Sequence, residues 1–182
     1  MPRISFRDNW WNLILIAALI GALQSRIPWF LIFVHVFSSI LWTGTDIFMG
    51  FVIGPVLRRV DFPSRRAVVT RLMPRMLFYM PTVATVSTTS GYYLAKWFGL
   101  FGHPYPQFYW VIGALIIVAI LFIQGLGMLL PTNLKVFFEM RKNQPDGARI
   151  QRLMGFYIKV VASQAVMQIA IITVMTRFRV GL

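Results

Sequence analysis

One long apolar stretch decides the fold of this 182-residue chain: residues 29–57, WFLIFVHVFSSILWTGTDIFMGFVIGPVL. A hydrocarbon core about 30 Å thick is crossed by roughly 20 apolar residues in a helix. The stretch is longer than that, and it contains no Lys or Arg and a single acidic residue, Asp46. It therefore predicts a membrane-spanning helix.

Outward from this helix, further stretches of similar character predict the rest of the architecture. Three of them are long enough to span a bilayer: residues 76–97, 108–130 and 155–176. A shorter apolar stretch, residues 10–24, is predicted as a short N-terminal fifth span, with a helix that lies in the membrane interface as the alternative. The predicted fold is all-α, a polytopic transmembrane helix bundle of four spans plus this fifth, in one integral membrane domain covering residues 1–182.

The composition excludes most other classes of protein. Hydrophobic residues make up 58% of the chain and charged residues 13%, whereas a soluble domain carries about 25% charged residues. The absence of cysteine excludes disulfides, iron–sulfur clusters and cysteine nucleophiles. Two histidines and five acidic residues are too few for most hydrolytic centres. Catalysis stays open, but the sequence favours a non-catalytic subunit over an enzyme in its own right.

The distribution of basic residues predicts the orientation of the bundle. The N-terminus and residues 58–75 and 131–158 together carry 13 of the 18 Lys and Arg residues. Membrane proteins concentrate such residues in short cytoplasmic loops. The sequence therefore predicts a cell (inner or cytoplasmic) membrane, a cytoplasmic N-terminus, and an external position for residues 98–107. Because the bases lie in clusters between apolar runs, the net charge of +13 indicates contact with the lipid bilayer and no nucleic-acid partner.

One face of the first long helix is polar. At 100° per residue His35 and Asp46 fall on the same side, and the opposite side is rich in phenylalanine. An ionisable residue deep in a membrane is costly, and it normally faces the interior of a bundle and marks a functional site. The alternative is that Asp46 only helps the helices to associate. The predicted polar interior comprises Asp46, Ser39, Trp42, Thr89 and Gln164.

Two kinds of side chain are candidate metal or cofactor ligands. A neutral imidazole such as that of His35 can coordinate haem iron or copper when its second nitrogen has a partner. The alternative is an imidazole that only hydrogen-bonds a neighbouring helix. The thioethers of Met49, Met76 and Met80 suit Cu(I), although methionine is also an adaptable apolar filler.

Small residues four apart suggest a close helix contact. Gly50 and Gly54 form a GxxxG motif near the end of the first long helix. Such a motif lets two helix backbones approach, either within one chain or between chains. Other membrane subunits or a homo-oligomer are the expected partners.

A resemblance to a known family begins at His35. The segment HVFSSILWTG, residues 35–44, has histidine and tryptophan seven positions apart and a glycine shortly afterwards, and TSGYYL follows at residues 89–94. Over residues 29–97 this pattern resembles the copper-resistance D-type and membrane protoporphyrinogen oxidase-like group of small polytopic membrane proteins, in its uncharacterised branch. In the oxidase branch the histidine is thought to bind haem b, which the resemblance carries to His35.

Two functions are consistent with these observations. The first is a subunit of a larger membrane complex, of the redox or electron-transfer kind, either with haem b bound through His35 or with no cofactor of its own. The alternative is a small transporter or metal-handling membrane protein that uses Asp46 and the methionines.

Overall fold

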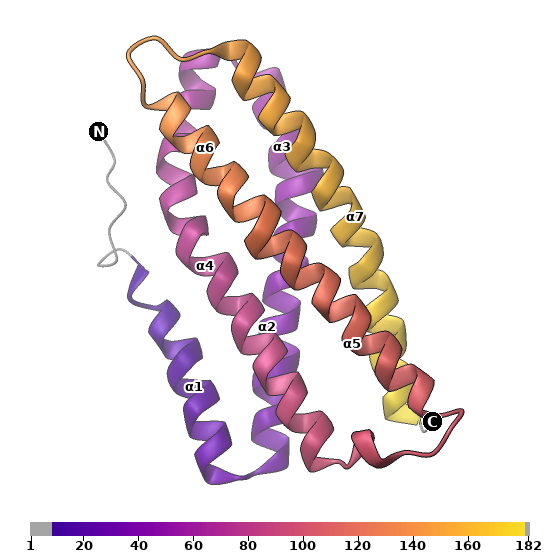
Figure 1. Ribbon diagram of the computed structural model, residues 1–182. Helices are drawn as coiled ribbons and strands as arrows, with labels where there is room; N and C mark the ends of the chain where they lie inside the picture. Colours follow the sequence, from indigo (N-terminus) through magenta and orange to yellow (C-terminus); the bar gives the residue numbers. More distant parts are fainter. Residues whose placement is uncertain (1–8, 181–182) are drawn as a thin grey trace.

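The computed structural model describes residues 9–180, and every element in that range is helical (Figure 1). Two long helices each contain a π-helical stretch in their middle. Each of them therefore carries three consecutive labels, α2–η2–α3 and α5–η4–α6. The elements are α1 (Asn12–Ser25), α2 (Pro28–Ile47), η2 (Phe48–Ile53), α3 (Gly54–Arg59), α4 (Phe62–Trp97), η3 (Leu100–Gly102), α5 (Phe108–Phe122), η4 (Ile123–Leu129), α6 (Leu130–Met140) and α7 (Gly147–Val180).

The helices form an elongated bundle in which α2 and α4 are the most extensive pair. The short α1 packs on both of them, and α5 packs on α7. Figure 1 shows the α3–α4 junction and the α6–α7 connection at one end of the bundle. The α1–α2 turn, the α4–α5 connection and the end of α7 lie at the other. The two basic segments of the sequence thus meet at the same end.

Three helical stretches within residues 9–180 are long and apolar enough to cross a membrane: Pro28–Arg59, Phe108–Met140 and Gly147–Phe178. The predicted all-helical, membrane-spanning architecture is therefore confirmed in this general form. Helix α4 is as long as these three, but its basic beginning and its hydroxyl-rich centre lower its hydropathy. Helix α1 has 14 residues, or about 21 Å, which is shorter than a hydrocarbon core.

The helices extend further than the apolar stretches of the sequence. Helix α4 begins at Phe62, so that only Val60 and Asp61 separate it from α3. The Asp61 side chain accepts a hydrogen bond from the backbone N–H of Ser64, 3.0 Å away, and a proline stands in the first turn. Both features start helices, and Arg is a good helix former. Most of the basic segment 58–75 is consequently helix.

Both π-helical stretches stand directly before a proline. Pro55 follows η2 by two residues, and Pro131 follows η4 by two residues. Proline has no N–H, and its ring clashes with the carbonyl four residues earlier, so a locally wider turn relieves the clash. Such turns frequently occur at functional sites. Here they lie deep inside two of the membrane-spanning stretches.

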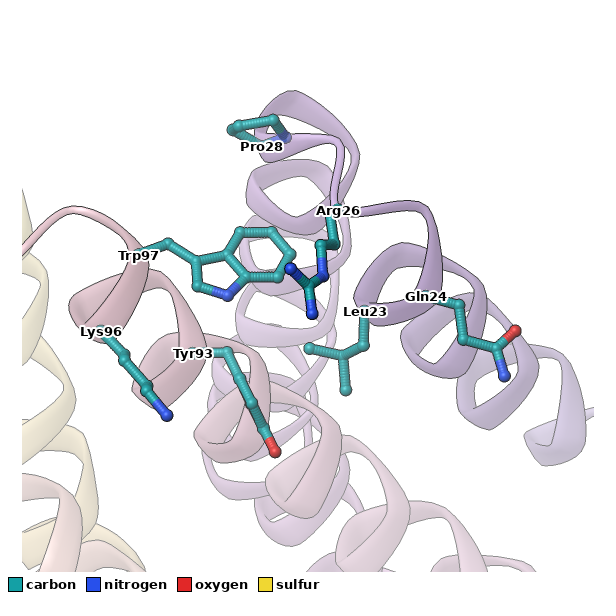
Figure 2. Close-up of a pocket in the computed structure, with 7 residues that line it drawn as sticks. All are labelled: Leu23, Gln24, Arg26, Pro28, Tyr93, Lys96 and Trp97. Atoms are coloured by element: carbon teal, nitrogen blue, oxygen red, sulfur yellow. The ribbon is translucent and has the colours of Figure 1, made fainter.

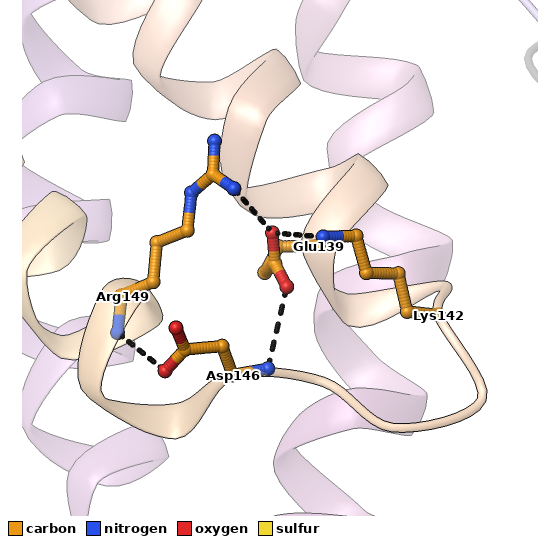
Figure 3. Close-up of polar contacts among 4 residues, drawn as sticks. All are labelled: Glu139, Lys142, Asp146 and Arg149. Carbon is orange, nitrogen blue, oxygen red and sulfur yellow. Dashed lines mark hydrogen bonds and ion pairs between the residues drawn. The ribbon is translucent and has the colours of Figure 1, made fainter.

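A buried glutamate organises the α6–α7 connection (Figure 3). The Glu139 side chain is 3% exposed, and its Oε2 lies 2.8 Å from Lys142 Nζ and 3.3 Å from Arg149 Nη1. Its Oε1 accepts from the backbone N–H of Asp146, and the Asp146 carboxylate in turn accepts from the N–H of Arg149. These contacts join the end of α6 to the first turn of α7, which shortens the connection to residues 141–146.

The GxxxG motif packs inside the chain. A Cβ at Gly50 would lie 3.3 Å from Val161 Cγ1 on α7, whereas one at Gly54 would meet only the carbonyl oxygen of Met49 on its own helix. Gly50 therefore serves a contact between α7 and η2, and the structure does not support the motif as a two-glycine contact surface.

Candidate functional site

The imidazole of His35 reaches from α2 to α4. Its Nδ1 lies 2.9 Å from the backbone carbonyl oxygen of Ser87 and 3.2 Å from the Ser90 hydroxyl. The Ser90 hydroxyl itself donates to the carbonyl of Val86 at 2.6 Å. Both neighbours of Nδ1 thus act as acceptors, and Nδ1 must carry the ring proton.

This proton position determines what the other nitrogen of His35 can do. In a neutral imidazole with the proton on Nδ1, Nε2 has a free lone pair. Metal-binding histidines commonly have this arrangement, because a carbonyl that accepts from one nitrogen orients the other toward the metal. No hydrogen bond occupies His35 Nε2 within the described part of the chain. The ring is therefore in the tautomer that can bind a metal through Nε2.

Gly91 makes room for the His35 ring. A Cβ built on Gly91 would lie 2.8 Å from Cε1 and 3.2 Å from Nδ1 of the imidazole, closer than carbon atoms approach one another. Any side chain at this position would push the ring away from Ser87. The glycine therefore permits the hydrogen bond that orients His35.

A second hydroxyl contact supports the same helix pair. Ser39 donates to the carbonyl of His35 at 2.7 Å, and its Oγ lies 2.7 Å from Ser87 Oγ. Since Ser39 has a single proton, Ser87 is the donor in the second contact. The His35 site, defined as His35, Ser39, Ser87, Ser90 and Gly91, is thus built entirely from α2 and α4.

Asp46 lies three turns further along the same face of α2. It is 4% exposed, and its Oδ2 accepts a hydrogen bond of 2.7 Å from Gln168 Nε2 on α7. The side chain of Trp42, one turn earlier, also hydrogen-bonds to the carboxyl group. The partner amide is Gln168, one turn beyond Gln164, which was the glutamine that the sequence placed in the polar interior.

A small cavity, which we call the Asp46 cavity, lies beside this carboxyl group. Its volume of about 20 Å³ is close to that of one water molecule. Four thioethers, a carboxylate, an amide, a phenol and a hydroxyl surround it. The lining residues are Thr45, Asp46, Met49, Met73, Met76, Met80, Asn133 and Tyr157.

The bundle interior contains, besides Asp46, buried glutamine side chains whose amide oxygens have no hydrogen-bond partner. Gln164 donates to the carbonyl of Leu121, and Gln124 donates to Ser163. The Oε1 atoms of Gln124, Gln164 and Gln168 are buried and have no hydrogen-bond partner. Buried polar groups are normally paired, so this part of the interior has spare acceptor capacity.

The residues singled out in the sequence are divided between the two sites. His35 and Ser39 belong to the His35 site. Trp42 and Asp46 lie further along α2, and Asp46 is about 16 Å from His35 along the helix axis. Gln164 is fully buried on α7, at 0% exposure. Thr89 is half-buried and makes no hydrogen bond to either site.

The candidate methionines converge on one point. Met49, Met76 and Met80 all line the Asp46 cavity, together with Met73. Spacings of three and four residues put Met73, Met76 and Met80 on one side of α4. The sequence already shows this spacing, whereas nothing in the local sequence marks Asn133 or Tyr157.

Another cavity, of about 690 Å³, opens between the ends of α1 and α4 (Figure 2). Figure 2 shows Arg26 pointing toward Trp97, with Lys96 and Tyr93 on the neighbouring turns of α4. Arg26 has a left-handed backbone conformation, with φ of 52°. Aromatic rings beside basic side chains are typical of the headgroup region of a bilayer.

The described part of the chain offers few clustered side chains that could bind a hard metal ion. Within residues 9–180 no group of three or more His, Asp or Glu side chains could hold a metal ion. The candidate ligands are instead one imidazole at the His35 site and the thioethers with a single carboxylate at the Asp46 cavity. Comparisons with protein-family models, with curated proteins and with solved structures give no match for this chain.

Proposed function

We propose that the chain is a membrane subunit of a redox or electron-transfer complex and that it binds haem b through Nε2 of His35. The observation that carries this proposal is the hydrogen bond from His35 Nδ1 to the Ser87 carbonyl, at 2.9 Å. It leaves Nε2 unprotonated and directs the ring, as the second partner of a metal-binding histidine does.

The residues present fit a haem ligand in two further respects. The imidazole itself fills the space beside Gly91, so the backbone of α4 lies directly against the ring. The neighbouring hydroxyls of Ser39, Ser87 and Ser90 are engaged with one another or with carbonyls and do not compete for Nε2. A bound haem would supply one-electron transfer. The role of this chain is to hold and orient its ligand nitrogen.

The small number of histidines supports a role as a subunit. The chain contains two histidines, and the other, His103, follows η3 in the connection between α4 and α5. It lies beyond the end of α4, whereas His35 faces the α4 segment around Ser87. We propose that a partner subunit would supply any further ligand to the group that His35 holds.

We also propose the membrane topology in full. Helix α4 packs along α2, so it crosses the membrane as a fourth span, and α1 is a short fifth segment. The end with the α3–α4 junction and the α6–α7 connection faces the cytoplasm, because most of the Lys and Arg residues lie there.

The visible absorption spectrum tests the redox proposal. The protein is purified in a mild detergent that retains its native partners. A Soret band and sharp reduced bands of the b type, in proportion to the amount of chain, are expected. A colourless preparation from cells supplied with haem precursors would contradict the proposal.

A second function is favoured by a separate observation, the Asp46 cavity. A space of about 20 Å³ that is lined by four methionines and one aspartate, among other residues, supports the handling of a metal ion in the bundle. Metal analysis of the purified protein after dialysis against each of several metal ions tests it. Retention of at least one kind of ion in proportion to the chain is expected, and retention of none would contradict it.

A further inference from the structure

The Asp46 cavity has the size of a single small ion or a single water molecule. Its volume is about 20 Å³, and a water molecule needs roughly 10–15 Å³ on this measure. Any organic cofactor is far too large for the space. The occupant that the cavity admits is therefore monatomic or is one water.

Half of the residues that line the cavity are methionines, which carry soft donor atoms. Met49 comes from η2, and Met73, Met76 and Met80 come from α4. Thioether sulfur binds Cu(I) well and binds hard ions such as Mg²⁺ or Ca²⁺ poorly. Zn²⁺ sites use thiolate, imidazole and carboxylate ligands, of which this cavity has only one carboxylate. The lining thus selects a soft metal ion over the common hard and intermediate ones.

The charge of the lining selects a monovalent ion. Within residues 9–180, Asp46 is the sole acidic residue that lines the cavity, and no Lys, Arg or His from that range lines it. Its two hydrogen-bond donors, Gln168 and Trp42, are both neutral. An ionised Asp46 consequently has no countercharge at the cavity. One positive charge balances it, whereas a divalent ion would leave an excess buried charge.

Some of the oxygen and nitrogen groups that line the Asp46 cavity already make hydrogen bonds to other side chains. Asn133 hydrogen-bonds the hydroxyl of Tyr157, and Thr45 Oγ1 lies 3.0 Å from the hydroxyl of Tyr79. Tyr79 itself donates to the carbonyl of Leu41, so Thr45 is the donor to Tyr79. These contacts reduce the number of hard donors that are free to coordinate an ion.

We infer that the Asp46 cavity binds one soft monovalent metal ion, Cu(I) or its analogue Ag(I), through methionine sulfur atoms with Asp46 as the balancing charge. The inference rests on the metal-handling function proposed above and specifies its ion. It is independent of haem binding at His35, which lies on the same face of α2 but about 16 Å away along the axis.

The test measures metal binding by the intact protein in detergent or lipid nanodiscs. Cu(I) is titrated without oxygen against a coloured chelator, and Ag(I) and Zn(II) are tested in parallel by equilibrium dialysis and metal analysis. One equivalent of Cu(I) or Ag(I) per chain is expected, with weak or no retention of Zn(II). X-ray absorption at the copper edge should report sulfur neighbours.

Matched variants assign the binding to this cavity. The double variant Met76→Leu, Met80→Leu conserves volume and removes two thioethers, so affinity for Cu(I) should fall at least tenfold. The control variant Met128→Leu, Met175→Leu removes two thioethers that do not line the cavity, and its affinity should be unchanged. Asp46→Asn keeps an acceptor for Gln168 and removes the charge, so it should also weaken binding. Thermal unfolding of each variant verifies that it is folded.

Each contrary result has a distinct meaning. If the protein retains Zn(II) and neither Cu(I) nor Ag(I), the inference is wrong while the metal-handling function stands. If it retains no metal, both are wrong. Equal Cu(I) affinity in the Met76/Met80 variant and in the Met128/Met175 control would place the ion elsewhere and would overturn the inference.

Discussion

The space that a side chain at residue 91 would occupy is filled by the imidazole of His35. For Gly91→Ala, the added methyl group would stand 2.8 Å from His35 Cε1 and would displace the ring from the Ser87 carbonyl. Overpacking of this kind costs roughly 1–3 kcal/mol. A lower thermal unfolding temperature in detergent and weakened haem binding are expected.

The chain offers a matched control for this substitution. Gly113 in α5 has no atom within 4 Å of an added Cβ. Gly113→Ala should be neutral or should stabilise the protein by up to about 1 kcal/mol, because Ala favours helix over Gly. Equal stability of the two variants would show that Gly91 does not position His35.

The hydrogen bond between Asp46 and Gln168 gives a prediction about polar burial. Asp46→Leu would leave the Gln168 amide unpaired in the interior, at a cost of about 1–3 kcal/mol. Asp46→Asn retains an acceptor and should unfold close to the wild-type temperature. Thermal unfolding of both variants measures the difference. A wild-type unfolding temperature for Asp46→Leu would show that the buried pair does not stabilise the bundle.

At the scale of the helix, the beginning of α4 depends on one exposed carboxylate. Hydrogen bonds from Ser64, by its side chain and its backbone N–H, hold the pKa of Asp61 below the usual 3.8. A carboxylate whose pKa is lowered by folding contributes stability above its unfolded pKa, and this contribution is lost as the pH falls through the folded pKa. The cap should therefore stabilise α4 at neutral pH and fail in acid.

Asp61→Ala tests this property of α4. The variant should unfold at a lower temperature than wild type at neutral pH, and the gap should narrow as the pH falls well below 3.8. Hydrogen exchange in the first turn of α4 should show the same trend. A gap that stays constant with pH would indicate that the Asp61 charge does not contribute to the cap.

Helix α2 illustrates how far the sequence predicts an element and its site. Its angular pattern correctly separated a buried face, with Trp42 and Asp46, from exposed phenylalanines such as Phe37 and Phe51. The pattern did not identify Gln168 as the partner of Asp46, because the register between two packed helices depends on both surfaces and on their crossing. Gln164 and Gln168 lie on one face of α7, and only the packed bundle distinguishes them.

The start of α4 shows a different limit. Hydropathy alone predicts a loop for the arginine-rich residues 58–75, since arginine avoids the hydrocarbon core. Arginine is nevertheless a good helix former, and Asp61 and Pro63 supply the signals for a helix start. Arg66 further donates to the carbonyls of Met140 and Lys142. The basic segment therefore joins α4 to the end of α6 as ordered structure.

At the scale of the whole molecule, the distribution of charge predicts which end faces the cytoplasm. Ser64 and Gly102 lie at opposite ends of the bundle, beyond α3 and α4 respectively. Because the chain has no cysteine, Ser64→Cys and Gly102→Cys each give a single reactive thiol. In sealed cells an impermeant maleimide should label the cysteine at residue 102 only. Labelling of both from outside would contradict the topology.

The central claim is that Nε2 of His35 binds haem iron, and chemical rescue tests it most directly. His35→Gly removes the imidazole and leaves a space of its size, into which free imidazole can bind. The b-type spectrum should be lost in this variant and should return when imidazole is added, while His103→Gly should keep the wild-type spectrum. A full b-type spectrum in His35→Gly without imidazole would contradict the account, and so would a wild-type protein that binds no haem.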